Sequence, residues 1–89
     1  MLELVRKSRF KKDFKKLHSS GKDLGKLAGV IRTLQAGGIL EERYRDHLLV
    51  GDYAGHRECH ISPDWLLIYQ TTDIELILVR TGSHGVLFG

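Results

Sequence analysis

The 89-residue sequence has little of what characterises secreted or membrane proteins. It contains one cysteine, Cys59, so no disulfide can form within the chain, which suits a reducing compartment. Its longest apolar run is only a few residues, too short to cross a bilayer. The first residues lack the basic segment and long apolar stretch of a signal peptide. We therefore expect a cytoplasmic protein with no membrane partner.

Internal repeats, low-complexity segments and linkers are also missing from the sequence. Hydrophobic residues make up 42% and charged residues 28%, the ordinary composition of a globular protein. A chain of this length is too short to divide into several cores. We expect one domain over residues 1–89.

Acidic residues are scarce in the first third of the chain. Residues 1–32 hold ten Lys/Arg and three Asp/Glu, a net charge of +7, whereas the remainder carries −4. A basic face favours a polyanion such as RNA, because binding releases counterions. A lysine-rich, solvated helix explains the same charge equally well, so charge alone leaves both interpretations open.

Two helices are predicted after a short strand at residues 2–5. Ser8 suits the N-cap of a helix with an apolar face of Phe10, Phe14 and Leu17, and Gly21 ends it. A second helix places Leu24, Leu27, Ile31 and Leu34 on one side and ends at residues 37–38. The helices should form a hairpin with lysines on its outer face.

The hydrophobic period changes after residue 38. Residues 39–55 resemble a loop with a short extended piece at 48–50, and three strands are predicted at 56–62, 65–71 and 74–80. Short turns at 63–64 and 72–73 favour antiparallel hairpins. The expected fold is α+β in the order β-α-α-β-β-β, a small antiparallel sheet with the N-terminal two-helix hairpin on one face.

Polar residues gather around these strands. Alternation along residues 56–62 turns Cys59 and Ile61 toward the core and His60 away from it. If the three strands are adjacent and antiparallel, the end of the last strand lies near the start of the second. Arg80 and His84 should then approach His60 and Asp64 in a cationic cleft on the open face.

Such a cleft suits RNA cleavage, in which the ribose 2′-OH attacks the neighbouring phosphate. Histidine can serve as the base for the 2′-OH or the acid for the 5′ oxygen, because its ordinary pKa is about 6.5. Arginine can hold the phosphate, and an aromatic such as Trp65 or Phe88 can stack on a base. These residue types suggest a nuclease without specifying one.

Three ordered motifs make the sequence resemble the YafQ toxins of the RelE superfamily. Residues 46–51 (DHLLVG) resemble their D-H-x-L-x-G, and residues 57–69 (RECHISPDWLLIY) resemble R-(D/E)-x-H-(V/I)-x-P-D-W-(I/L)-L-(I/V)-Y. Residues 80–88 (RTGSHGVLF) resemble R-(T/L)-G-(T/S)-H-x-x-L-F. Residues 1–38 match only in pattern.

The resemblance implies a RelE-like fold and the toxin of a type II toxin–antitoxin system. It implies an endoribonuclease that cuts mRNA on the ribosome with no metal or other cofactor. The expected partners are the ribosome, mRNA and a cognate antitoxin that carries a ribbon-helix-helix DNA-binding part, with operator DNA bound only through the complex.

The resemblance also implies seven site residues. They are His47, His60, Asp64, Arg80 and His84 as catalytic residues, and Trp65 and Phe88 as substrate-binding aromatics. Structural alternatives remain open for each: Arg80 can pair with Asp64, Asp64 can shape a turn, Trp65 can pack in the core and Phe88 can anchor the C-terminus. His56 is a spectator, and Cys59 is a core residue rather than a nucleophile.

Three other functions compete with RNA cleavage. One is a plain RNA- or antitoxin-binding domain that has lost catalysis, and the intact motif argues against it. A ParE-like toxin that inhibits DNA gyrase by binding fits the same fold and charge, but does not need the acid–base residues. A metal site fits the side-chain types of His47, His60, Asp64 and His84. Their spacing matches no short metal motif, and Arg80 among them would repel a cation, so we predict none.

Overall fold

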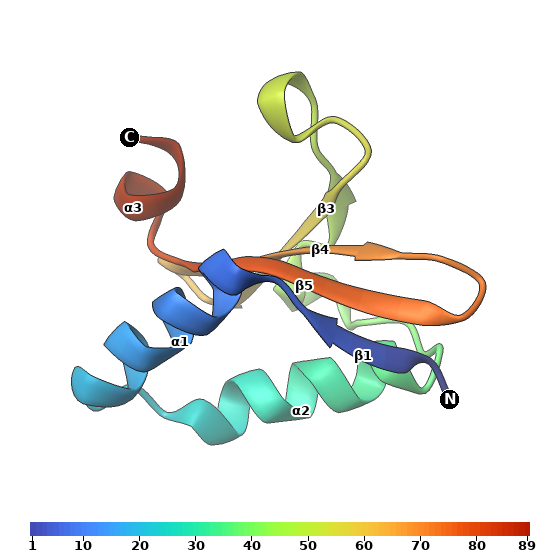
Figure 1. Cartoon of the computed structure of the whole chain (residues 1–89), viewed down its shortest axis with the longest axis horizontal. Coiled ribbons are helices and arrows are strands. Elements are labelled where there is room, and N and C mark those ends of the chain that lie inside the picture. Colours follow the sequence, from blue (N-terminus) through green and yellow to red (C-terminus); the bar gives the residue numbers. More distant parts are fainter.

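The computed structural model describes the whole chain, residues 1–89, as one mixed sheet with helices on both sides (Figure 1). The strands are β1 (Glu3–Arg6), β2 (His47–Leu48), β3 (Arg57–Ser62), β4 (Trp65–Thr71) and β5 (Glu75–Gly82). The α-helices are α1 (Ser8–Ser19), α2 (Leu24–Gln35) and α3 (His84–Phe88). Two 3-10 turns complete the list, η1 (Glu42–Tyr44) and η2 (Gly51–Tyr53).

The sheet has the strand order β1-β5-β4-β3-β2. The pairs β2–β3, β3–β4 and β4–β5 are antiparallel, which confirms the three predicted strands and their short turns. β1 pairs parallel with β5, so the prediction of an antiparallel sheet is wrong at this edge. The sequence period could not show this, because strand direction depends on how the chain returns to the sheet after α1 and α2.

Helices α1 and α2 cover one face of the sheet (Figure 1). Their buried residues Phe10, Leu17, Leu27 and Val30 pack with inward side chains of β3, β4 and β5 in a core of 12 residues. Phe14, predicted on the buried face of α1, is 37% exposed. The helical hairpin itself is confirmed.

The caps of these helices differ in part from the prediction. Ser8 is the first helical residue of α1, and Lys7 occupies the N-cap without a side-chain hydrogen bond. Asp23 caps α2 by accepting a hydrogen bond from the Gly25 N–H. Gly21 and Gly37 follow the helix ends with φ of 79° and 78°, a left-handed conformation that glycine adopts without strain.

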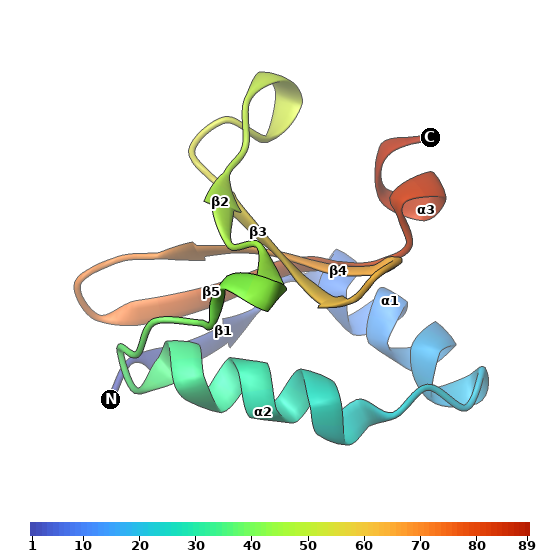
Figure 2. The same cartoon turned by 180° about the vertical axis from the view of Figure 1, so that it is seen from behind.

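The opposite face carries a smaller cluster of buried Leu66, Ile68 and Leu87, with Tyr53 packed against it. Leu87 belongs to α3, a short C-terminal helix that the sequence period did not predict. Ser83 caps α3 by accepting a hydrogen bond from the Val86 N–H at 3.2 Å. Seen from behind, η1 lies against β3 on the side away from α3 (Figure 2). No helix is long and apolar enough to cross a membrane.

Candidate active site

Three of the predicted histidines lie close together around β3, on the open face of the sheet. His60 lies on β3 and His47 on the neighbouring β2, whose register places it opposite Glu58. His84 lies at the first position of α3, and its ring centre is 6.0 Å from that of His60. The tertiary structure thus brings together residues that are 13 and 24 positions from His60 in the chain.

Glu58 is the buried carboxylate of this cluster. Its side chain is only 4% exposed, and its Oε1 lies 3.7 Å from His47 Nε2 and 3.5 Å from His60 Nε2. A buried carboxylate is costly without positive or hydrogen-bonding partners, and His47 and His60 are in position to provide them. No role was predicted for Glu58. Its position two residues before His60, and therefore on the same side of β3, was the available indication.

The hydrogen-bond partners indicate how the two rings carry their protons. His47 Nδ1 lies 2.6 Å from the Arg45 carbonyl oxygen, which can only accept, so Nδ1 carries a hydrogen. His60 directs Nε2 toward Glu58, which leaves Nδ1 without a protein partner. His60 is therefore arranged to accept a proton at Nδ1, with Glu58 stabilising the imidazolium that results.

Asp64 holds His84 rather than shaping its own turn. Its Oδ1 accepts the His84 backbone N–H at 3.1 Å and lies 3.9 Å from His84 Nδ1. Both side chains are largely exposed, at 58% for His84 and 73% for Asp64, so water screens the ion pair. The backbone hydrogen bond fixes the start of α3 beside the β3–β4 turn, and the imidazole remains open to a substrate.

Phe88 lies at the rim of the cluster. Its ring centre is 5.6 Å from that of His84 and 5.8 Å from that of Tyr53, and the residue is 44% exposed. One side of the ring thus packs against the protein, while the other remains available to stack on a base. The predicted anchoring and substrate contact are compatible.

Arg80 does not pair with Asp64, so the structural alternative of an ion pair between them is wrong. Its guanidinium donates from Nε and Nη2 to the two carboxylate oxygens of Asp13 on α1, both at 2.9 Å. Asp13 Oδ2 also accepts the Thr81 N–H at 3.2 Å, where β5 extends past the end of β1. These hydrogen bonds to the Asp13 carboxylate raise the pKa of Arg80. Three guanidinium N–H groups remain beyond those that bind Asp13.

Trp65 is buried, with 2% of its surface exposed, so its predicted stacking on a base is not supported by its position. Its indole Nε1 donates to Thr81 Oγ1 at 3.0 Å, and Thr81 in turn donates to the Leu66 carbonyl. The Lys22 amino group lies 5.9 Å from the ring centre. The alternative of core packing is therefore confirmed.

The side chains on the inward face of β3 have structural rather than catalytic roles. Cys59 is fully buried, and burial first, then the negative charges of Asp46 and Glu58, raises its thiol pKa to about 12. Tyr69 is also buried, and its hydroxyl donates to Asp46 Oδ1 at 2.6 Å; burial and this hydrogen bond raise its pKa. Arg57 donates to the same oxygen at 3.1 Å. Asp46 thereby anchors the segment that carries His47.

No group of three or more His, Cys, Asp and Glu side chains is arranged to hold a metal ion. The chemical groups available at the cluster are therefore imidazoles, carboxylates and nearby guanidinium groups. They can accept and donate protons and can hold an anion.

Comparison with known proteins identifies the family. Residues 2–89 match the family model described as bacterial toxin of type II toxin-antitoxin system, YafQ. The chain belongs to the YafQ family. It is 41% identical over 81 residues to the mRNA interferase toxin YafQ of Escherichia coli K12, an alignment that covers 90% of this chain and 88% of that protein.

Solved structures of YafQ-family and similar toxins share this fold over their full length. A crystal structure of a copper-bound mutant toxin from Helicobacter pylori is 48% identical, with a TM-score of 0.94 over 99% of this chain and all of the other. YafQ in the E. coli DinJ–YafQ complex is 37% identical, with a TM-score of 0.91 over all of both chains. The α+β, RelE-like fold class is therefore confirmed.

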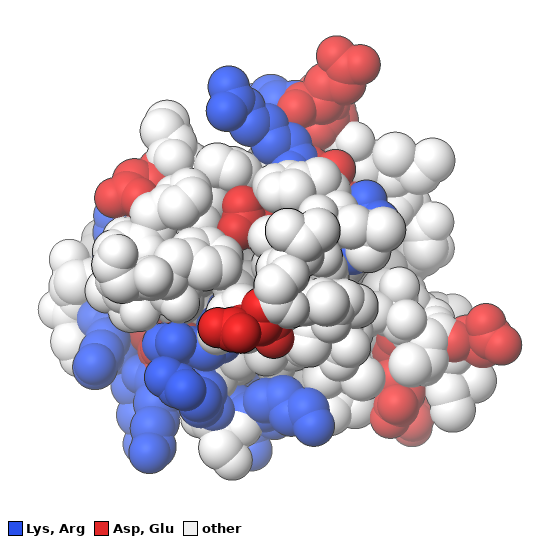
Figure 3. Space-filling model, turned by 90° about the horizontal axis from the view of Figure 1, so that it is seen from above, with Lys and Arg blue, Asp and Glu red and all other residues white.

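Charge is distributed unevenly around the site of this YafQ-family chain. In the view from above the sheet, Lys and Arg side chains gather on the side where α1 lies, and a second, smaller group lies at the far edge (Figure 3). This concentration of positive charge attracts a polyanion to the side of the molecule where α1 lies.

Proposed function

We propose that this chain is an mRNA interferase: a toxin that stops translation by cutting mRNA on the ribosome. The observation that carries the proposal is the placement of His60 and His84, one beside a buried carboxylate and one exposed, with ring centres 6.0 Å apart. One of these rings can accept a proton while the other donates one to a phosphodiester bound beside them. The similar protein of E. coli K12 is named mRNA interferase toxin YafQ.

The reaction proceeds by transfer within the RNA. His60 Nδ1 accepts the proton of the ribose 2′-OH, whose oxygen attacks the adjacent phosphorus. The bond to the 5′ oxygen breaks, and protonated His84 donates its proton to that oxygen. The products are a 2′,3′-cyclic phosphate and a 5′-OH, so the reaction consumes no water and no electrons.

The other site residues orient these two histidines and stabilise charge. Glu58 stabilises the imidazolium of His60, and His47, held by the Arg45 carbonyl, completes the positive surface beside it. Asp64 fixes the position of His84. Arg80 stabilises the phosphorane through its remaining N–H groups, and Phe88 stacks on the adjacent base.

The partners follow from the same site. A cognate antitoxin with an acidic segment neutralises the basic surface and covers the histidine cluster; in E. coli, YafQ has been solved in complex with DinJ. The DNA-binding part of the cognate antitoxin is of the ribbon-helix-helix kind, so this chain reaches operator DNA only through the complex. The toxin acts in the cytoplasm, where ribosomes present mRNA. Gyrase binding, the alternative function, makes no use of the histidine cluster.

Replacing His84 with Ala tests the mechanism. Loss of a general acid should slow cutting of ribosome-bound mRNA by roughly 10²–10⁴-fold. The His84 side chain is 58% exposed, so folding should change little. His18→Ala is the matched control, because His18 is an exposed histidine at the far end of α1 and should leave the rate unchanged.

A substrate with an activated 5′ leaving group separates acid catalysis from other effects. Such a group departs with little protonation, so the His84→Ala variant should recover much of its rate, whereas a His60→Ala variant should not. Normal cutting by a folded His84→Ala protein would refute the mechanism, and absence of mRNA cutting by the unchanged chain would refute the function.

A further inference from the structure

A cleft of about 550 Å³ lies beside the histidine cluster, at the edge of the sheet between α2, η1 and the β3–β4 turn. Eight residues line this edge cleft, and none of them is acidic. Its basic members and its histidine are Lys26, Arg43, Arg45 and His60. Its volume falls within the range of about 300–1,000 Å³ typical of ligand sites.

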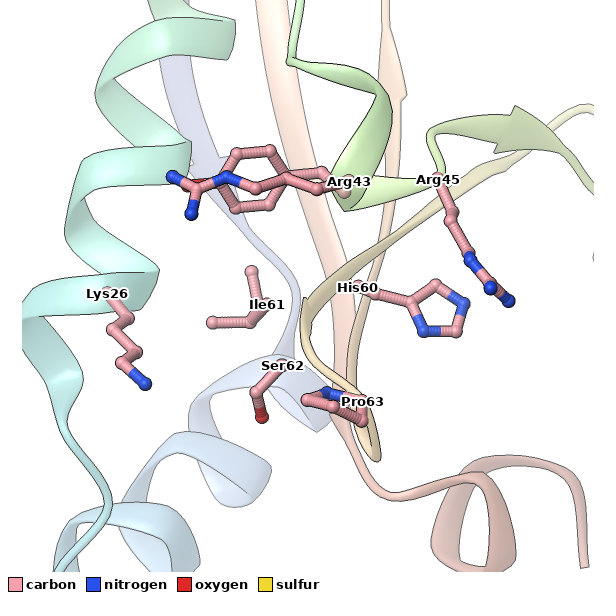
Figure 4. A pocket seen from close by; sticks show the side chains of 8 residues that line it. Lys26, Arg43, Arg45, His60, Ile61, Ser62 and Pro63 are labelled. Atoms are coloured by element: carbon pink, nitrogen blue, oxygen red, sulfur yellow. The ribbon is translucent and has the colours of Figure 1, made fainter.

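The edge cleft runs along the part of β3 whose outer edge is not paired with another strand. β2 pairs with β3 only at Arg57 and Glu58, so the edge is unpaired from there to the β3–β4 turn. Lys26 and the Arg43 guanidinium lie on one side of this edge, and His60 lies on the other with Arg45 (Figure 4). A flexible chain crossing the edge therefore meets positive charge on both sides.

We propose that the edge cleft binds the phosphodiester backbone of the mRNA strand next to the scissile phosphate. This proposal rests on the proposed function, because His60 is shared by the cluster and the cleft. A strand that places one phosphate between His60 and His84 continues directly into the cleft. Arginine binds phosphate oxygens through paired N–H groups and lysine as a point charge.

The lining of the edge cleft favours RNA over a protein segment. An amphipathic antitoxin helix needs a row of apolar pockets, but only two of the eight lining residues are hydrophobic. Arg43 has one acidic neighbour, Glu41, at 3.7 Å, and their side chains are 70% and 74% exposed. Such an exposed pair is weak. Arg43 Nη2 also donates to the Tyr44 hydroxyl at 2.9 Å, so its other N–H groups are the ones that can bind a phosphate.

The first test measures the half-saturating toxin concentration and the maximal rate for cutting of ribosome-bound mRNA. Lys26→Gln, Arg43→Gln and Arg45→Gln should each raise the half-saturating concentration by roughly two- to fivefold, with a smaller effect on the maximal rate. Arg32→Gln on α2, outside the cleft, is the matched control and should have no effect. Glu41→Gln removes the acidic neighbour of Arg43 and should act in the opposite direction.

The second test neutralises the RNA instead of the protein. An mRNA with uncharged methylphosphonate linkages beside the cleavage site should bind the unchanged chain and the triple Lys26/Arg43/Arg45→Gln variant equally. With normal linkages, the triple variant should reduce the slope of log affinity against log salt by about 2, because each phosphate contact contributes about 0.7.

Three results would overturn the edge cleft as an mRNA site. The first is normal mRNA cutting by the triple variant. The second is a loss of affinity for the ribosome that does not depend on the charge of the mRNA linkages. The third is a loss of affinity for the antitoxin alone. The last two results would instead assign the cleft to the ribosome or to the antitoxin. Failure of the unchanged chain to cut mRNA would be distinct, because it refutes the proposed function and the subsite with it.

Discussion

The buried pair of Asp13 and Arg80 should make a large contribution to stability, and breaking it gives a sharp prediction. The two side chains are 8% and 9% exposed, and Asp13 accepts three hydrogen bonds from β5. Removing one partner of a buried pair costs about 3–5 kcal/mol, since the remaining charge is left uncompensated. A chain of this length has a total stability of about 4–13 kcal/mol, so Asp13→Ala should remove roughly a quarter of it or more.

Urea denaturation followed by circular dichroism measures the effect. With a slope of about 1 kcal/mol per molar urea, the midpoint should fall by about 3 M. Asp73→Asn, in the exposed β4–β5 turn, is the matched control and should shift the midpoint very little. A loss below about 1 kcal/mol for Asp13→Ala would refute the argument from burial.

Replacing both partners separates the structural role of Arg80 from its proposed chemical role. The variant Asp13→Leu/Arg80→Met leaves no buried charge, so it should recover most of the stability lost in Asp13→Ala. Because this variant should fold, its rate of mRNA cutting reports on the guanidinium alone. A rate equal to that of the unchanged chain would show that Arg80 serves only to join α1 to β5.

Two further predictions concern pH and salt. The free energy of unfolding should fall as pH rises from 9 to about 12, because unfolded Cys59 releases its thiol proton near 9 whereas the folded chain retains it. Cys59→Val should remove this part of the slope; an unchanged slope in urea titrations across that range would contradict the assignment. Antitoxin should associate more slowly as salt rises, because opposite charges accelerate the encounter. A stopped-flow association rate independent of ionic strength would show that charge does not guide the encounter.

Local physics made much of the fold predictable from sequence. Apolar spacing along α1 and α2 and the short turns at residues 63–64 and 72–73 depend on neighbours in the chain, and the structure has these elements within one to three residues of the prediction. Alternation along β3 placed Cys59 and Ile61 in the core and His60 on the open face, and burial confirms it. The antiparallel order of β3, β4 and β5 was enough to bring His84 to Asp64.

Tertiary structure decided what depends on contacts between distant residues. The parallel pairing of β1 with β5, the pairing of Arg80 with Asp13 across 67 positions, and the burial of Trp65 beside Thr81 have no local pattern in the sequence. Glu58 became a site residue only when β2 placed His47 opposite it, so that one buried carboxylate faces two imidazoles. Sequence determined which groups are present and which way each strand faces; packing determined which charges are paired, and hence which remain available for chemistry.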